Sequence, residues 1–185
     1  MLTGDRVRLR AIEREDLDLL AAFDNDVELE LIANDVPPRP VSRASRRQRF
    51  DEQLKEARDV VPFVIEAGGT AIGECSLGGF DQVARTCELG IAIGDRDYWG
   101  RGYGRDAVRV LVAYGFRSFN LHKIWLAVQA GNERAVRVYR ACGFADEGRL
   151  REQWYSAGHY VDVLLMGLLR SDWEASRGIG DGEPA

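Results

Sequence analysis

The stretch Arg96-Asp97-Tyr98-Trp99-Gly100-Arg101-Gly102-Tyr103-Gly104-Arg105 joins an apolar segment that predicts a strand, 86–93, to an amphipathic segment that predicts a helix, 105–119. Three glycines at alternate positions let the backbone turn its N–H groups inward without interference from Cβ atoms. The start of the helix adds about half a positive charge at the same point, and Arg101 and Arg105 add more. The loop therefore predicts a binding site for an anion, most naturally a pyrophosphate. A glycine-rich surface turn is the alternative.

Two common nucleotide-binding motifs do not account for this loop. The sequence has no G-x-x-x-x-G-K-[ST] stretch, so it does not predict a P-loop NTPase. A dinucleotide-binding G-x-G-x-x-G is expected in the first strand–helix unit of its domain, whereas this loop follows several predicted strands. A Rossmann fold is therefore not predicted either.

The elements before and after the loop predict one α+β domain without repeats or linkers. The predicted strands are 6–12, 62–67, 70–77, 86–93, 123–128, 144 onward and 160–169, and the predicted helices are 15–23, 42–57, 105–119 and 133–142. We therefore expect about seven strands flanked by about four helices, in a single domain over residues 1–170. Residues 171–185 are predicted to be a flexible C-terminal tail, because the sequence after Arg177 is rich in Gly, Asp and Pro.

Composition and charge exclude several classes of protein. The 185 residues are 45% hydrophobic and 30% charged, as in an ordinary globular domain. The longest apolar run, Val163–Leu169, is far shorter than the ~20 residues of a membrane span. The three cysteines, Cys75, Cys87 and Cys142, are too scattered for a disulfide framework or a metal site. A net charge of −5 argues against general nucleic-acid binding, and with no apolar signal segment at the N-terminus we expect a cytoplasmic protein.

The charge is unevenly distributed along the chain. The acidic residues between positions 13 and 35 are Glu13, Glu15, Asp16, Asp18, Asp24, Asp26, Glu28, Glu30 and Asp35. With one base, Arg14, this segment alone carries −8. It predicts either a solvated helix face or an acidic surface that attracts a cationic partner by long-range steering. The arginines between positions 39 and 49 most simply form a solvated helix face.

Two stretches of the sequence resemble one known family. Glu88–Ile93 is followed by Tyr98–Gly104, and Gly131–Ala135 is followed by Tyr139 and Cys142–Phe144. At this spacing they resemble the GCN5-related N-acetyltransferase (GNAT) superfamily, in particular the branch of ribosomal-protein N-terminal acetyltransferases and spermidine acetyltransferases. The resemblance covers the chain up to about residue 170. It implies the GNAT fold, a mixed central sheet flanked by helices, and acetyl-CoA as co-substrate with no metal.

The resemblance also implies a role for each matching residue. The backbone of Ile91–Ile93 would pair with the pantetheine arm of acetyl-CoA, Asn132 would lie beside that arm, and Tyr139 would point at the thioester sulfur. The implied cofactor-binding residues are Ile91, Ala92, Ile93, Trp99, Gly100, Arg101, Gly102, Tyr103, Gly104, Arg105, Asn132 and Arg134. Trp99 departs from the superfamily, which usually has Gln or Arg at this position, although aromatic residues at this position are familiar in the branch that the chain resembles. Because the family contacts the pyrophosphate mainly through the backbone, we still expect CoA binding.

The implied reaction is direct attack of an amine on the acetyl-CoA carbonyl, without an acyl-enzyme. Cys75 and Cys87 are disfavoured as nucleophiles, because cysteines in strands are usually small core residues.

An amine must be neutral to attack, and at pH 7 deprotonation costs ~4–5 kcal/mol for a polyamine amine but ~1 kcal/mol for a protein α-amine. A polyamine therefore needs a general base: Glu88 is the first candidate and Glu74 the second, although each is equally well an ordinary strand carboxylate. Tyr139 is expected to donate a hydrogen bond to the departing sulfur, or else to be a core tyrosine.

The sequence thus predicts an acetyl-CoA-dependent N-acetyltransferase whose acceptor is a cationic amine, either a protein N-terminus or a polyamine. A non-catalytic CoA-binding regulatory or sensor module is the alternative. Gln153-Trp154-Tyr155 and His159-Tyr160 are candidates for the acceptor slot, although they do not choose a substrate. We expect no membrane and no direct nucleic-acid partner, and the family allows a homodimer.

Overall fold

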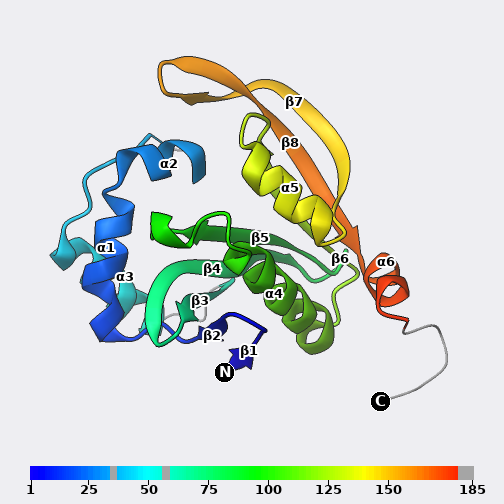
Figure 1. Ribbon diagram of the computed structural model, residues 1–185, viewed down its shortest axis with the longest axis horizontal. Coiled ribbons are helices and arrows are strands. Elements are labelled where there is room, and N and C mark those ends of the chain that lie inside the picture. Colours follow the sequence, from blue (N-terminus) through cyan, green and yellow to red (C-terminus); the bar gives the residue numbers. More distant parts are fainter. Residues whose placement is uncertain (34–36, 56–58, 179–185) are drawn as a thin grey trace.

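The computed structural model describes residues 1–33, 37–55 and 59–178, which form one eight-stranded sheet flanked by helices (Figure 1). The strands are β1 (Leu2–Thr3), β2 (Arg8–Arg10), β3 (Val60–Ala67), β4 (Thr70–Asp81), β5 (Thr86–Ile93), β6 (Lys123–Gln129), β7 (Ala145–Ser156) and β8 (His159–Leu169). The helices are α1 (Leu17–Asp24), α2 (Val27–Ala33), α3 (Arg43–Lys55), α4 (Tyr103–Phe119), α5 (Glu133–Ala141) and α6 (Arg170–Ser176), with short 3-10 helices η1 (Arg14–Asp16) and η2 (Arg96–Tyr98). The predicted α+β class and mixed sheet are confirmed. In the described ranges, no helix is both long and apolar enough to cross a bilayer.

The strands follow the order β1-β2-β3-β4-β5-β6-β8-β7 across the sheet. β5 and β6 run parallel and are joined by α4, since a parallel connection needs such a crossover. These two strands pair only between Thr86–Glu88 and Lys123–Trp125. Beyond that point β5 continues beside β4 to Ile93, and β6 continues beside β8 to Gln129. The sheet is therefore split in its middle.

Side chains are buried on both faces of the sheet. Val64 and Ile65 are neighbours on β3 and so point to opposite faces, yet each is 0% exposed. Ile65 belongs to the main core, into which α4 packs its apolar stripe, including Ala107 and Leu111. On α1, Leu20 is buried outside that core, and the helix contacts β4 and α3.

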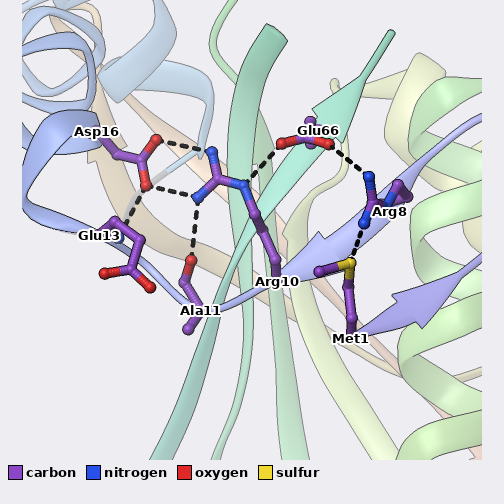
Figure 2. Close-up of polar contacts among 7 residues, drawn as sticks. All are labelled: Met1, Arg8, Arg10, Ala11, Glu13, Asp16 and Glu66. Atoms are coloured by element: carbon purple, nitrogen blue, oxygen red, sulfur yellow. Dashed lines mark hydrogen bonds and ion pairs between the residues drawn. The ribbon is translucent and has the colours of Figure 1, made fainter. Parts of the chain in front are cut away.

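A partly buried arginine fixes the start of α1 (Figure 2). Arg10 on β2 donates to both carboxylate oxygens of Asp16, at 2.7 and 2.8 Å, and to Glu66 on β3 at 2.8 Å. Asp16 also accepts from the backbone N–H of Glu13 at 2.8 Å, and the hydrogen bonds from Arg10 hold the pKa of Asp16 below its usual value. A bidentate arginine–carboxylate pair is directional as well as strong. The pair therefore sets the angle at which the chain leaves the sheet.

Some elements differ from the prediction. β1 adds a two-residue strand at the sheet edge, and residues 27–33 form α2 although no helix is predicted there. The predicted flexible tail begins at residue 171, but residues 170–176 form α6, which packs on the fold. Its Trp173 is 8% exposed and packs on Phe116, with 5.2 Å between ring centroids. Residues 179–185 of that tail, and Ala57 of the predicted helix 42–57, lie outside the described residues.

Replacing Gly94 with alanine is expected to destabilise the fold. A Cβ at this position would lie 2.2 Å from the ring of Phe23 on α1, so the ring or the strand end would have to move. Overpacking of this kind costs about 1–3 kcal/mol, which lowers Tm by roughly 2–12 °C in a chain of this size. Thermal unfolding measures the effect. Gly131→Ala is the matched control, because a Cβ there meets nothing within 4 Å; equal losses in both variants would contradict the role of the Phe23 contact.

Candidate active site

A cavity lies where β5 and β6 separate, bounded by the end of β5, the glycine-rich loop, α2, β6 and α5. The predicted site residues that line it are Ile91, Ala92, Ile93, Trp99, Gly100, Gly102, Gly104, Arg105, Asn132, Arg134 and Tyr139. The fold thus brings the two stretches that resemble the family to one place. Arg101 and Tyr103 are not among the lining residues, and Tyr103 packs edge-on against Tyr98, with 5.0 Å between ring centroids.

The glycine-rich loop turns through two residues with positive φ. Gly100 has φ +71° and Gly102, the N-cap of α4, has φ +89°. Side chains disfavour this conformation, which explains why glycine is needed at both positions. The turn brings the start of a 17-residue helix to the cavity wall, where Gly104 and Arg105 lie. The first N–H groups of a helix have no partner within it, so this wall is suited to an anion.

Asp106, in the first turn of α4, is directed to the N-terminal strands. Its carboxylate accepts from the backbone N–H groups of Arg6, at 2.7 Å, and Val7, at 3.0 Å. The residue is 8% exposed. Its negative charge is therefore used to hold the β1–β2 connection against the start of the helix.

α2 forms the outer wall of the cavity and is held by side chains from three other segments. Gln129 at the end of β6 and Ser156 at the end of β7 both donate to the carbonyl of Leu31, at 2.5 and 2.7 Å. Asn132, the N-cap of α5, donates to the carbonyl of Ile32 at 3.5 Å. Carbonyls in the last turn of a helix have no partner within it, so these bonds fasten α2 across the split. No helix is predicted over residues 27–33 from the sequence, because the contacts that hold α2 join residues 98 to 125 positions apart.

Tyr139 on α5 lines the cavity with a largely buried side chain. It is 8% exposed, and burial raises the pKa of its phenol to about 12. Its ring meets Phe144 edge-on, with 6.0 Å between centroids. The phenol stays protonated at neutral pH, so Tyr139 is suited to donate a hydrogen bond.

The two candidate general bases lie on neighbouring strands and are not among the residues that line the cavity. Glu74 lies opposite Ala92 in the β4–β5 pairing and accepts from Arg46 at 2.6 Å. Glu88 is exposed and lies at the last position where β5 pairs with β6, opposite Trp125. Either carboxylate would have to act on the cavity through water or after a movement.

A second cavity adjoins the first. The residues common to both are Ile32, Gln129, Asn132 and Arg134. Of the residues predicted for the acceptor slot, Trp154 lines the first cavity and His159 the second. Tyr155 and Tyr160 are 58% and 65% exposed and pack against each other. The site thus has two adjoining compartments, one bounded by the glycine-rich loop and one by the β7–β8 turn.

Arginines take up much of the acidic charge between residues 13 and 35. The ion pairs are Asp16 with Arg10, Asp18 with Arg43 and Arg47, Asp24 with Arg46, and Asp26 and Glu28 with Arg96. Asp35 lies outside the described residues. Several of these arginines belong to α3, which is where the sequence predicts a solvated basic face. The pairing weakens the expectation that this segment steers a cation over long distances.

Cys75 and Cys87 are core residues, as predicted. They are 3% and 0% exposed, and burial raises the pKa of both thiols, that of Cys87 to about 12. Cys142 is partly exposed and lies 3.6 Å from the carbonyl oxygen of Arg105; burial raises its pKa to about 11. These environments disfavour a thiolate nucleophile.

Comparison with known proteins gives consistent matches. A family model described as an acetyltransferase (GNAT) domain matches residues 6–145. The chain is 30% identical over 174 residues to an uncharacterized N-acetyltransferase, p20, of Bacillus licheniformis, covering 93% of this chain and 97% of the relative. It is 29% identical over 175 residues to the spermidine N(1)-acetyltransferase of Escherichia coli K12, covering 95% and 92% of the two chains.

A solved structure extends these matches to three dimensions. It is the crystal structure of spermidine N-acetyltransferase from Vibrio cholerae in complex with CoA and spermine. It aligns with a TM-score of 0.84 at 29% identity, covering 92% of this chain and 99% of that one. A further structure of the Vibrio cholerae enzyme is dodecameric.

The native protein is expected to react slowly with thiol reagents at neutral pH. Two thiols are buried, and the raised pKa of Cys142 leaves little thiolate at that pH. Reaction with dithionitrobenzoate measures the rate, and denatured protein, in which all three cysteines should react, is the control. Rapid labelling of Cys75 or Cys87 in the native protein, located by mass spectrometry, would contradict their placement in the core.

Proposed function

The chain belongs to the acetyltransferase (GNAT) family, and from this premise we propose that its acceptor is a primary amine of a polyamine. Membership makes the chain an N-acetyltransferase that takes its acetyl group from acetyl-CoA. The choice of acceptor is supported by a relative named for spermidine acetylation that matches nearly the whole chain. It is also supported by the structural neighbour that holds CoA and spermine.

The residues of the first cavity fit acetyl-CoA. Gly100 and Gly102 let the backbone approach a diphosphate at the start of α4, and Arg105 lies beside them. Beyond Glu88, β5 is not paired with β6, so its backbone groups can bind an extended chain that carries amides, as pantetheine does. Acetyl-CoA, when bound, supplies an acetyl thioester that a neutral amine can attack. These features are the observation on which the proposal depends.

Tyr139 would keep its proton and donate a hydrogen bond from Oη to the departing sulfur. With a phenol pKa of about 12 against ~8.5 for a thiol, complete proton transfer costs about 5 kcal/mol. A hydrogen bond to a developing charge in a buried site lowers the barrier without that transfer.

The acceptor amine needs a route for its proton, because a polyamine amine costs ~4–5 kcal/mol to deprotonate at pH 7. Glu88 is the proposed general base, with Glu74 the second candidate. Glu88 and Ala92 lie on the same face of β5, and Ala92 lines the cavity. A carboxylate on this face can receive the proton through water.

Spermidine is expected to be acetylated with a higher kcat/KM than peptides with a free N-terminus. Thiol release from acetyl-CoA measures this, and the rate should rise between pH 7 and 9 as the amine loses its proton. A preference for the peptides would reassign the acceptor.

CoA at 100 times its Kd should stabilise the fold by ~2.7 kcal/mol, or roughly 5–10 °C in Tm. Such a shift without turnover of any amine would indicate the sensor module instead.

Tyr139→Phe is expected to lower kcat by roughly 10–100-fold with little change in KM, because it removes a hydrogen bond to a developing charge. Steady-state kinetics with saturating acetyl-CoA measure the split. Tyr114→Phe is the control, since Tyr114 packs its ring against Phe63 and Phe119 on the far part of α4. An unchanged kcat in Tyr139→Phe would remove this phenol from the mechanism.

A further inference from the structure

Trp99 lies where three walls of the cofactor cavity meet. Its indole N–H donates to the carbonyl of Ile93, the last residue of β5, at 2.7 Å. Its ring stacks with Arg134 from α5, with 3.7 Å between the guanidinium carbon and the ring centroid. Because Trp99 itself belongs to the glycine-rich loop, one indole ties the loop to the end of the strand and to the helix.

Arg134 differs from the other arginines of α5. Arg137 pairs with Glu133 at 3.1 Å, and Arg140 pairs with Asp146 at 2.6 Å. Within the described part of the chain, Arg134 has no ion-pair partner, and burial lowers the pKa of its guanidinium. The face of Trp99 offsets only part of the cost of taking this charge out of water. A partly buried cation without a carboxylate partner is suited to an anionic ligand.

Arg134 places a positive charge in the cavity where the anionic cofactor is proposed to bind. Arg134 lines the same cavity as Gly100, Gly102 and the start of α4. The one polar atom of the Trp99 side chain is occupied by the carbonyl of Ile93, so Trp99 has no donor for a phosphate. Arg105 from α4 and Arg134 from α5 both bring positive charge to this cavity, and the indole ring of Trp99 holds the guanidinium of Arg134 in place.

We propose that Arg134 is the counter-charge for the diphosphate of CoA and that Trp99 is the residue that positions it. The proposal rests on acetyl-CoA as the co-substrate. It assigns the stacked pair a part in cofactor affinity, separate from the chemistry at Tyr139. It also gives Trp99 a physical role through its aromatic ring, which stacks on Arg134.

Isothermal titration with CoA, with 3′-dephospho-CoA and, by competition, with pantetheine tests the charge. Arg134→Gln should weaken binding of CoA and of 3′-dephospho-CoA by about 10–100-fold, as expected for a charge-assisted hydrogen bond. Its affinity for pantetheine should stay at the wild-type value. Arg137→Gln is the matched control, because it removes the same charge from the same helix at a residue that does not line either cavity. It should bind all three ligands as the wild type does.

A double-mutant cycle tests the positioning role of Trp99. Trp99→Leu should weaken CoA binding by a factor similar to Arg134→Gln, and the double variant should be no weaker than either one, because the two residues act as a unit. Trp99→Phe, which keeps an aromatic face, should recover part of the affinity. If Trp99→Leu fails to fold, as its Tm would show, the cycle is run with Trp99→Phe.

The outcomes separate this inference from the proposed function. A wild-type protein that does not bind CoA would overturn both. Wild-type binding with unchanged CoA affinity in Arg134→Gln, an equal loss for pantetheine, or additive effects in the cycle would overturn the role of the pair alone. A loss for CoA that is absent for 3′-dephospho-CoA would place the charge on the 3′-phosphate and contradict the assignment to the diphosphate.

Discussion

The site depends on a sheet that stops pairing in its middle. Thr86–Glu88 pairs with Lys123–Trp125, and then β5 and β6 diverge. Each separated strand stays paired on its outer side, β5 with β4 and β6 with β8, so the opening removes only the inner ladder of hydrogen bonds. Backbone groups along that opening need water or a ligand as partners. The fold therefore creates a binding site from main-chain atoms before any side chain is considered.

Polar contacts between distant segments hold the walls of this opening. Asp106 holds the start of α4 against the β1–β2 connection, Arg10 sets the departure of α1, and Gln129 and Ser156 fasten α2 through Leu31. Such contacts are directional, which apolar packing is not. Ion pairs with arginines also explain why the segment between residues 13 and 35, with a formal charge of −8, can lie beside a substrate cavity. Many of its carboxylates are structural partners of arginines.

Local patterns in the sequence predict the strands, the long helix and the glycine-rich loop, because these elements follow from periodicity and from the conformational freedom of Gly102. α2 escapes prediction, since its last turn is held by side chains about a hundred positions away. α6 is missed because Trp173 anchors it through tertiary packing against Phe116. In the site, the motif predicts Tyr139 and Arg134, and both line the cavity. It cannot reveal that Arg134 stacks on Trp99, nor that Glu74 and Glu88 lie off the cavity wall, because both depend on how strands and helices meet.

The place of β8 in the sheet links the order of synthesis to the completion of the fold. β8 is inserted between β6 and β7, and Val163–Leu169 supplies the whole partner ladder for Lys123–Gln129. Until that segment has left the ribosome, β6 presents an open strand edge, the kind of surface on which other chains assemble. At a synthesis rate of about 5–20 residues per second, the forty residues from 130 to 169, the end of β8, keep this edge open for roughly 2–8 s. Throughout this interval the nascent chain exposes a strand edge on which other chains can assemble.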